Sequence, residues 1–304
     1  MFENILGNEK NKNILTKSIR LNKASHSYIF WGIEGIGKKA IAKEFAKMIL
    51  CMEENAKKYC GKCKSCIEFD SNNNPDFQLI EPNKGKVKIE QIREMQRKLS
   101  EKPIISDKKV YIINDAETMT TEAQNCLLKT LEEPPEYAII ILICSNENNL
   151  LSTIKSRCTR IYFEPIPQED IKKYLEINYG YNQISQNMLS LFQGSIGKAI
   201  NLKEHQELYK NIEKILINLK DKDLIDIIQM SEEIYKSKEE IQSILEYINV
   251  LLLEFSKKNM RYIKCIEIIE DTKNRLKANS NYDMCIDNML FNIWEEVNEK
   301  NNRS

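Results

Sequence analysis

A glycine-rich loop between a strand-like and a helix-like segment constrains the fold of this chain more than any other feature. The stretch "FWGIEGIGKKAIAKEF" spans residues 30–45. An aromatic and apolar run precedes the loop, and apolar residues at helical spacing follow it. A strand, a glycine loop and a helix in this order form the context that a phosphate-binding loop requires. The candidate nucleotide-binding residues of the loop are Gly32, Gly35, Gly37 and Lys38.

Strand-like and helix-like segments continue to alternate after the loop. The strand-like runs lie at 76–82, 108–115 and 137–146, and the helix-like segments lie at 89–100 and 120–133. The strand-like runs are almost continuously apolar, which is typical of a parallel sheet with both faces buried. The sequence therefore predicts an α/β domain with a parallel sheet over residues 1–163.

The pattern changes at "EPIP", residues 164–167, because these prolines cannot continue a helix or an interior strand. The chain beyond this point is helix-like. We expect a small helical domain at 164–203 and a second helical domain at 204–304. An apolar stripe from Ile241 to Phe255 lies on one face of a predicted helix. Core packing explains this stripe better than a partner surface does.

A cluster of cysteines indicates a metal site. The chain has nine cysteines, and four of them lie within residues 51–66. Four thiolates suit tetrahedral Zn²⁺ and leave no open position for water, so a zinc ion bound here would be structural. A redox dithiol and a set of unrelated thiols are the alternatives, but the overlapping C-x-x-C spacing favours a metal. The candidate ligands are Cys51, Cys60, Cys63 and Cys66.

Two parts of the nucleotide site argue against ATP hydrolysis. Lys39 stands where such a loop carries a Ser or Thr whose hydroxyl holds Mg²⁺. Asn114 and Asp115 stand where we expect an Asp for Mg²⁺ and a Glu that orients the attacking water. Because phosphoryl transfer depends on positioning and electrostatics, the two losses reinforce each other. The loop is expected to permit phosphate binding without hydrolysis. Whether a nucleotide, either ATP or ADP, binds to the loop stays open.

The composition excludes some classes of function. The 45 basic side chains balance 45 acidic ones, which argues against a protein that holds nucleic acid mainly by a large positive field. The N-terminal residues contain no apolar signal core, and the longest apolar stretches are too short to cross a bilayer. We therefore expect a soluble, cytoplasmic protein without a membrane partner.

Several motifs occur in an order that is typical of one known family. They are "HSYIFWGIEGIGKKAIA", the four-cysteine insertion, "LLKTLEEPP", "STIKSRC" and "GSIGKAI". Through these motifs the chain resembles the subunits of the bacterial DNA polymerase III clamp loader, an AAA+ assembly, and among them the delta-prime family. The resemblance covers residues 1–203, and the rest of the chain matches only in length and helical character.

The resemblance implies an AAA+ domain, a small helical lid and a helical collar that joins the subunits of a hetero-oligomer. The implied partners are the tau/gamma motor subunits and delta, with the sliding clamp and primed DNA in the same complex. Delta-prime has a degraded ATP site in this family, in agreement with Lys39 and Asn114. Gly197 likewise stands where the motor subunits carry a lid arginine that contacts ATP.

Arg157 in "STIKSRC", residues 152–158, is the one residue with an implied catalytic role. From the residues alone, a surface arginine in a salt bridge is the better interpretation. In the clamp-loader family, the arginine of this motif reaches the ATP held by the adjacent motor subunit. The resemblance therefore implies that Arg157 acts in trans as an arginine finger.

Two other functions are compatible with parts of the sequence. Lys38 and Asp115 support a self-sufficient AAA+ ATPase, such as a motor subunit or a remodeler, whereas Lys39, Asn114 and Gly197 oppose it. A zinc-ribbon protein that binds nucleic acid is a third possibility, which the neutral overall charge weakens.

Overall fold

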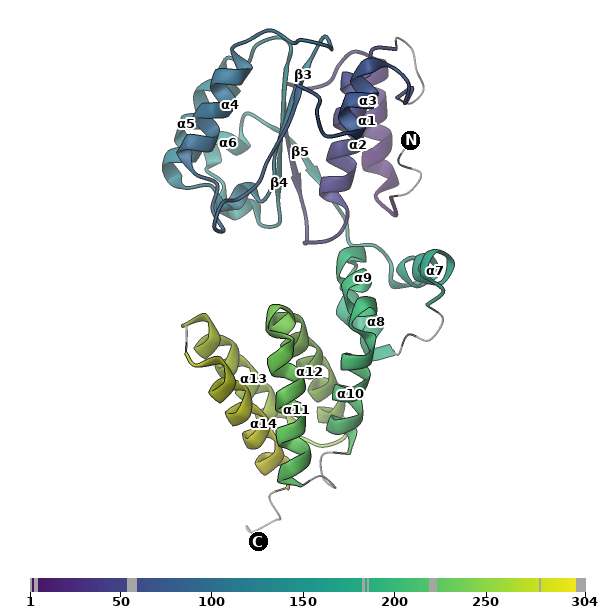
Figure 1. Ribbon diagram of the computed structural model, residues 1–304, viewed down its shortest axis with the longest axis vertical. Coiled ribbons are helices and arrows are strands. Elements are labelled where there is room, and N and C mark those ends of the chain that lie inside the picture. Colours follow the sequence, from purple (N-terminus) through teal and green to yellow (C-terminus); the bar gives the residue numbers. More distant parts are fainter. Residues whose placement is uncertain are drawn as a thin grey trace. The chain divides into compact units, whose positions relative to one another are not determined.

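The chain divides into two compact units (Figure 1). The computed structural model describes residues 2, 5–53, 59–181, 184, 186–218, 223–278 and 280–298. The first unit comprises Met1–Tyr174 and Gly194–Gly197, and the second comprises Leu175–Gln193 and Lys198–Ser304. The finer division into domains at 1–163, 164–203 and 204–304 stays a prediction.

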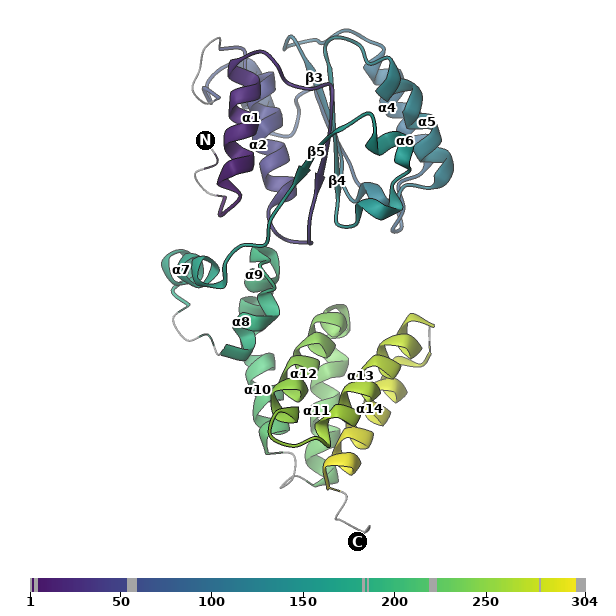
Figure 2. The ribbon, with the colours of Figure 1, turned by 180° about the vertical axis from the view of Figure 1, so that it is seen from behind.

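The first unit contains a five-stranded parallel sheet with the strand order β2-β3-β4-β1-β5. Figures 1 and 2 show α1 and α2 on one face of this sheet and α4, α5 and α6 on the other. The strands are β1 (Ser27–Trp31), β2 (Phe77–Ile80), β3 (Lys109–Ile113), β4 (Ala138–Cys144) and β5 (Thr159–Tyr162). The helices are α1 (Glu9–Arg20), α2 (Lys38–Leu50), α3 (Lys64–Asp70), α4 (Ile89–Leu99), α5 (Thr121–Glu132) and α6 (Ser152–Lys155), with short 3₁₀ helices η1 (Ala116–Thr118) and η2 (Glu147–Asn149). The predicted α/β fold with a parallel sheet is confirmed.

Both faces of the sheet are buried, which explains why its central strands are mostly apolar. In β4, Ile139 and Ile141 pack in the core that includes residues of α2, whereas Ile140 and Leu142 pack in the core that includes residues of α4 and α5. Successive side chains of a strand point to opposite faces, so a strand covered on both faces has no position for an exposed polar residue. All seven residues of β4 are accordingly buried.

Two helices and one strand of the first unit are absent from the sequence-based prediction. In α1, which is rich in Lys and Asn, Leu15 is fully buried but its apolar neighbours are few. α3 has only seven residues and forms the end of the cysteine insertion, by which we mean the four-cysteine segment together with α3, residues 51–70. In β5, Ile161 is the one buried residue of "TRIY". These elements lie at the periphery of the core and therefore carry no clear apolar periodicity.

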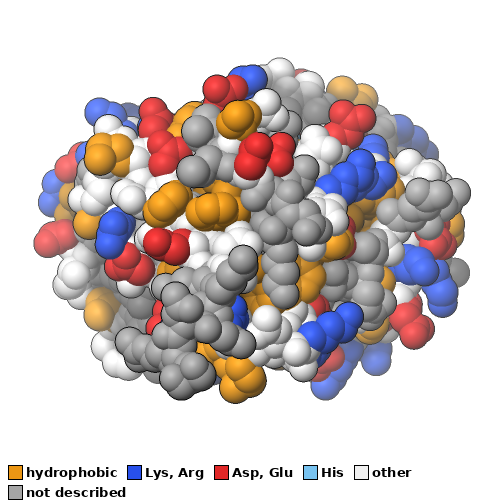
Figure 3. Space-filling model, turned by 90° about the horizontal axis from the view of Figure 1, so that it is seen from below, with side chains coloured by type: hydrophobic (Ala, Val, Ile, Leu, Met, Phe, Trp, Pro, Cys, Tyr) orange, Lys and Arg blue, Asp and Glu red, His pale blue; other side chains and the backbone are white. Residues whose placement is uncertain are grey.

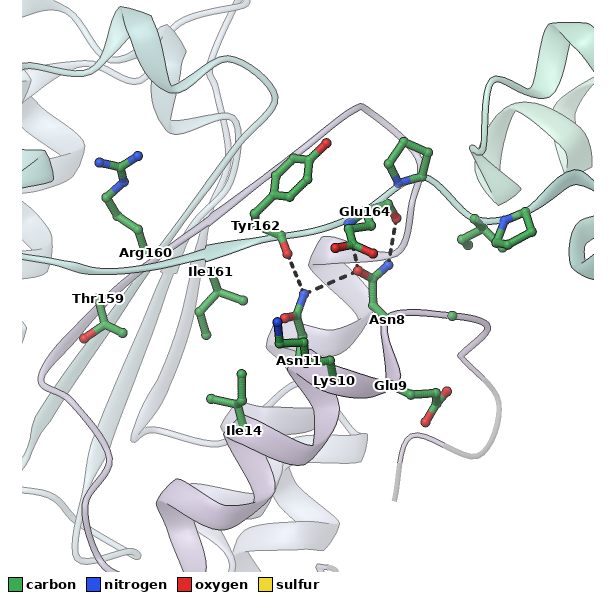
Figure 4. Close-up of a pocket in the computed structure, with 14 residues that line it drawn as sticks. Asn8, Glu9, Lys10, Asn11, Ile14, Thr159, Arg160, Ile161, Tyr162 and Glu164 are labelled. Atoms are coloured by element: carbon green, nitrogen blue, oxygen red, sulfur yellow. Dashed lines mark hydrogen bonds between the residues drawn. The ribbon is translucent and has the colours of Figure 1, made fainter.

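β5 forms one edge of the sheet, and two asparagines cover the end of this edge (Figure 4). Asn8 donates through Nδ2 to the carbonyl oxygen of Glu164 at 3.1 Å and accepts from the Glu164 N–H at 2.9 Å. Asn11 donates to the carbonyl oxygen of Tyr162 at 2.7 Å. A cavity of about 530 Å³ lies beside these contacts and is lined by residues of α1 and β5. The side-chain amides of Asn8 and Asn11 therefore form hydrogen bonds that the backbone of a neighbouring strand would otherwise form at this end of the edge.

The buried carboxylate of Asp76 anchors the segment that leads into β3. Its two oxygens accept the backbone N–H groups of Ile104, Ile105 and Ser106 at 2.7–2.8 Å, and Asp76 is only 1% exposed. A carboxylate in a buried position needs such donors to offset its lost hydration.

We expect Asp76→Ala to lower the free energy of unfolding by about 3 kcal/mol, because three backbone donors lose their acceptor. Urea denaturation of the full chain measures this change. The neighbouring exposed residue Asp107 provides the control, since Asp107→Ala should change stability by less than about 0.5 kcal/mol. Equal stabilities of the two variants would contradict the anchoring role.

The described part of the chain beyond Pro167 is helical and contains no strand. The boundary between the two units falls within α7 (Gln168–Tyr179) and again within α9 (Ile196–Glu204). The other helices are α8 (Gln186–Phe192), α10 (Gln206–Ile217), α11 (Leu224–Lys236), η4 (Lys238–Glu240), α12 (Ile241–Ser256), α13 (Tyr262–Lys277) and α14 (Tyr282–Asn298). This agrees with the change of pattern expected at 164–167.

α12 lies at the centre of the second unit and packs against α8, α10 and α13. Its stripe residues Ile244, Leu245, Ile248, Leu251 and Leu252 are fully buried, so the core-packing interpretation of the stripe is confirmed. On the face drawn in Figure 3, basic and acidic side chains are interspersed with hydrophobic ones. Among the described residues, no helix has the length and apolar character needed to cross a membrane.

Candidate functional site

The glycine loop lies between the end of β1 and the start of α2, where the carboxyl edge of a parallel sheet places a ligand site. Gly37 precedes the first helical residue, Lys38, and has φ +94°. An L-residue rarely adopts this conformation, so glycine is needed for the loop to turn directly into the helix. The backbone N–H groups at the start of α2 are the groups that bind phosphate in loops of this kind.

Lys38 is turned back onto its own loop. Its Nζ donates to the carbonyl oxygens of Gly32 at 2.5 Å and Ile33 at 2.7 Å, and the residue is only 6% exposed. Burial lowers the pKa of Lys38, although nearby acidic groups including Glu117 oppose this shift. The ammonium group therefore has partners within the loop and must exchange them before it can bind a phosphate.

The segment Gly194–Gly197 packs directly on the glycine loop. The N–H of Gly197 donates to the carbonyl oxygen of Gly35 at 2.8 Å. A Cβ atom added to Gly35 would lie 2.2 Å from Oγ of Ser195, which is fully buried. The sequence identified Gly197 only as the absence of an arginine. The contact gives the glycine a second role, since it allows two backbone segments to touch.

The polar residues around the loop are paired with each other. Lys39 forms an ion pair with Glu81, so its positive charge faces a carboxylate. Asn114 donates from Nδ2 to Oδ2 of Asp115 at 3.0 Å. Burial raises the pKa of Asp115, and the negative charge of Glu117 adds to the rise. Asn114 stands at the expected magnesium position and supplies a neutral amide. Asp115 stands at the expected water position and supplies a carboxylate that already accepts a hydrogen bond from Asn114.

Glu117 belongs to this site but was not identified from the sequence. Its Oε1 accepts the N–H of Ser145, just beyond β4, at 2.6 Å. Its Oε2 is buried and has no hydrogen-bond partner among the described residues. The available signal was its position three residues after Asn114, at the end of a predicted strand. Glu117 thus joins the ends of β3 and β4, and its charge acts on Lys38 of the glycine loop.

Arg157 lies at the junction of α6 and β5. Its backbone is fixed to β1 because Oγ of Ser27 donates to the Arg157 carbonyl oxygen at 2.8 Å. Its guanidinium pairs with Glu132 at 2.7 Å and donates to the carbonyl oxygen of Thr153 at 2.9 Å. The side chain is 34% exposed. The salt bridge expected from the residues alone is present, and it joins the "LEEPP" and "SRC" motifs.

The four clustered cysteines converge in space. Cys51 follows α2, Cys60 and Cys63 precede α3, and Cys66 lies within α3. Their sulfur atoms all lie within 4.8 Å of one another. Four sulfurs bound to one tetrahedral Zn²⁺ at about 2.3 Å are about 3.8 Å apart, so the observed cluster can hold a metal ion. The zinc-module prediction covers 51–66, of which 54–58 lie outside the described residues.

The thiols of the cysteine cluster differ in pKa because their surroundings differ. Burial alone would raise the pKa of Cys63, but N–H groups of Met52 and Cys66 outweigh this effect and lower that pKa to about 7. Burial raises the pKa of Cys66. A thiol that ionises near neutral pH provides the first thiolate for a metal, and a bound cation favours ionisation of the remaining thiols.

A glycine-rich loop at the carboxyl end of β1, followed by α2 in a five-stranded parallel sheet, is the arrangement of a P-loop-type α/β domain. Residues 7–167 match the protein family described as DNA polymerase III, delta subunit. The chain belongs to this family, and curated relatives named DNA polymerase III subunit delta′ identify it as a delta-prime-like member.

Curated relatives carry the names of two kinds of subunit. DNA polymerase III subunit delta′ of Bacillus subtilis is 34% identical over 203 residues, which cover 67% of this chain and 61% of that protein. Its counterpart in Escherichia coli is 31% identical over 191 residues, 62% of this chain and 57% of that protein. Subunit tau/gamma of Haemophilus influenzae is 32% identical over 174 residues, 57% of this chain and 25% of that protein. The matches thus span less than two thirds of these relatives.

Proposed function

We propose that this chain is a non-hydrolysing subunit of a DNA polymerase III clamp loader and helps to load the sliding clamp onto primed DNA during replication. The observation that carries the proposal is the state of the nucleotide loop. Lys38 is held by loop carbonyls, and Lys39 and Asn114 replace the groups that would hold Mg²⁺. Membership of the delta-prime-like group supports the same conclusion.

The proposed partners are the tau/gamma motor subunits and delta, with the clamp and primed DNA in the same complex. The collar through which such subunits would associate is proposed to be the helical region 204–304, which lies within the second unit. Co-purification of this chain with the other loader proteins, followed by ATPase assays with and without it, tests the proposal. Failure to enter the complex would contradict it.

Within this complex, Arg157 is proposed to act on the ATP of a neighbouring motor subunit. Three features support the role: a fixed backbone, a partly exposed guanidinium and a position in the "SRC" motif. Glu132 would hold the side chain until a phosphate replaces the carboxylate. The planar guanidinium of arginine can form two parallel hydrogen bonds to a carboxylate or to a phosphate. Arg157 could therefore release Glu132 and bind a phosphate through the same kind of contact.

The cysteine cluster is proposed to bind one structural Zn²⁺ through Cys51, Cys60, Cys63 and Cys66. The convergence of four sulfurs supports this assignment. The ion would take no part in catalysis, because four protein ligands leave no position for a reacting water.

We expect the isolated chain to hydrolyse ATP no faster than the background. Lys39→Thr should also be inactive, because Asn114 still lacks the carboxylate that binds Mg²⁺. Steady-state phosphate release by the purified chain measures the rate.

Lys38→Ala provides the control for contaminating ATPases, because activity from a contaminating protein would persist in preparations of this variant. Turnover that Lys38→Ala abolishes would contradict the proposal and would favour the alternative of a self-sufficient AAA+ ATPase.

A further inference from the structure

Lys47 is a buried lysine that the proposed function does not use. It lies in the last turn of α2, and its side chain is only 9% exposed. A buried ammonium group loses its hydration and needs partners that compensate for this loss. The partners of Lys47 both belong to the cysteine insertion.

The first partner lies on the helix that carries one of the candidate metal ligands. Nζ of Lys47 is 2.6 Å from Oδ1 of Asp70, the last residue of α3. Cys66 lies four residues earlier on the same helix, one turn away. The ion pair therefore fixes α3, and Cys66 with it, against α2.

The second partner lies on the other arm of the insertion. Nζ of Lys47 is 3.9 Å from the centroid of the Tyr59 ring, within the range of a cation–π interaction. Tyr59 directly precedes Cys60. One ammonium group thus contacts a neighbour of Cys60 and the helix of Cys66, and it joins two separate segments that supply sulfur atoms to the cluster.

We propose that Lys47 is the positioning residue of the zinc site: it holds the two arms of the cysteine insertion in the metal-binding arrangement and offsets the negative charge of the bound centre. Zn²⁺ with four thiolates has a formal net charge of about −2, so a neighbouring buried cation stabilises the loaded form. This inference rests on the zinc binding included in the proposed function.

The test measures zinc affinity of the full-length chain by competition with a chromophoric chelator. We expect Lys47→Met to weaken zinc binding about 10- to 100-fold, the usual effect of losing a residue that orients metal ligands. Methionine fills the buried space, and Asp70 is 58% exposed and can be hydrated, so the variant should fold. Visible spectra of the cobalt-substituted protein report the geometry of the site.

Two further variants separate charge from packing. Asp70→Asn removes one partner but keeps the cation, and we expect a smaller loss of affinity than for Lys47→Met. Lys43→Met is the matched control, because Lys43 lies one turn earlier on α2 and, among the described residues, forms no hydrogen bond or ion pair with the cysteine insertion. Its zinc affinity should equal that of the unmodified chain.

The outcomes distinguish this inference from the proposed function. If the unmodified chain binds zinc and Lys47→Met binds it equally tightly, the inference is wrong and the zinc site stands. If the unmodified chain binds no zinc, both the inference and the proposed metal site are wrong.

Discussion

Replacing Arg157 with alanine is expected to slow ATP hydrolysis at the motor-subunit site on which it is proposed to act by about 10³- to 10⁵-fold, the range found for arginine fingers. The guanidinium would neutralise charge that develops on the transferred phosphoryl group, and alanine cannot. The chain itself should still fold, bind zinc and assemble, since the Arg157–Glu132 pair is partly exposed and pairs of this kind contribute up to about 1 kcal/mol. The ATPase rate of reconstituted complexes that differ only at this residue measures the effect.

Arg160 provides the matched control for this substitution. It lies three residues away in β5, is 48% exposed and pairs with Glu147 at 2.8 Å. Arg160→Ala also removes an arginine–glutamate ion pair, although Glu147 is less exposed (15%) than Glu132 (49%), and it should leave the rate unchanged. Arg157→Lys should restore little activity, because an ammonium group lacks the planar fork that matches phosphate oxygens. Equal rates for complexes with and without Arg157 would rule out a role in trans.

Replacing Cys63 with serine is expected to release the zinc ion and to loosen the insertion around it. Binding of structural zinc contributes about 10–16 kcal/mol in small zinc-binding peptides, so loss of one ligand has a large effect on a local structure that depends on the metal. Elemental analysis should find one zinc per unmodified chain and none in the variant. Limited proteolysis should cut the variant within the insertion.

A cysteine outside the cluster serves as the control. Cys126 lies on α5 and donates from Sγ to Oε1 of Gln96 at 3.2 Å, with no cluster cysteine as its partner. Cys126→Ser keeps a donor at this position and should retain the metal. Absence of zinc from unmodified protein prepared without chelators would remove the basis for the prediction.

The sequence predicts those parts of the fold that rely on burial of contiguous segments. β4 is apolar from end to end because helices cover both of its faces, and it was predicted on that basis. β5 was missed because hydrogen bonds to β1 define it, whereas its side chains are mostly exposed. α1 was missed for a similar reason, since few of its residues reach the core.

The same distinction applies to the candidate site. The glycine loop and the cysteines are local patterns whose chemistry follows from spacing, and the structure brings each set together. The contact of Gly197 with Gly35 joins residues that are far apart in the chain, as does the pair of Arg157 with Glu132. A single sequence holds no direct signal for such contacts, because each residue also has a common role as a surface or turn residue.

The asparagines beside β5 affect how this sheet behaves toward other chains. An uncovered edge strand offers free N–H and C=O groups onto which a foreign strand can add, the first step of many aggregation reactions. Asn8 and Asn11 already satisfy the outward groups of Glu164 and the carbonyl of Tyr162. An incoming strand would have to displace three hydrogen bonds to extend past Ile161, so side chains at the start of α1 protect the sheet from intermolecular growth.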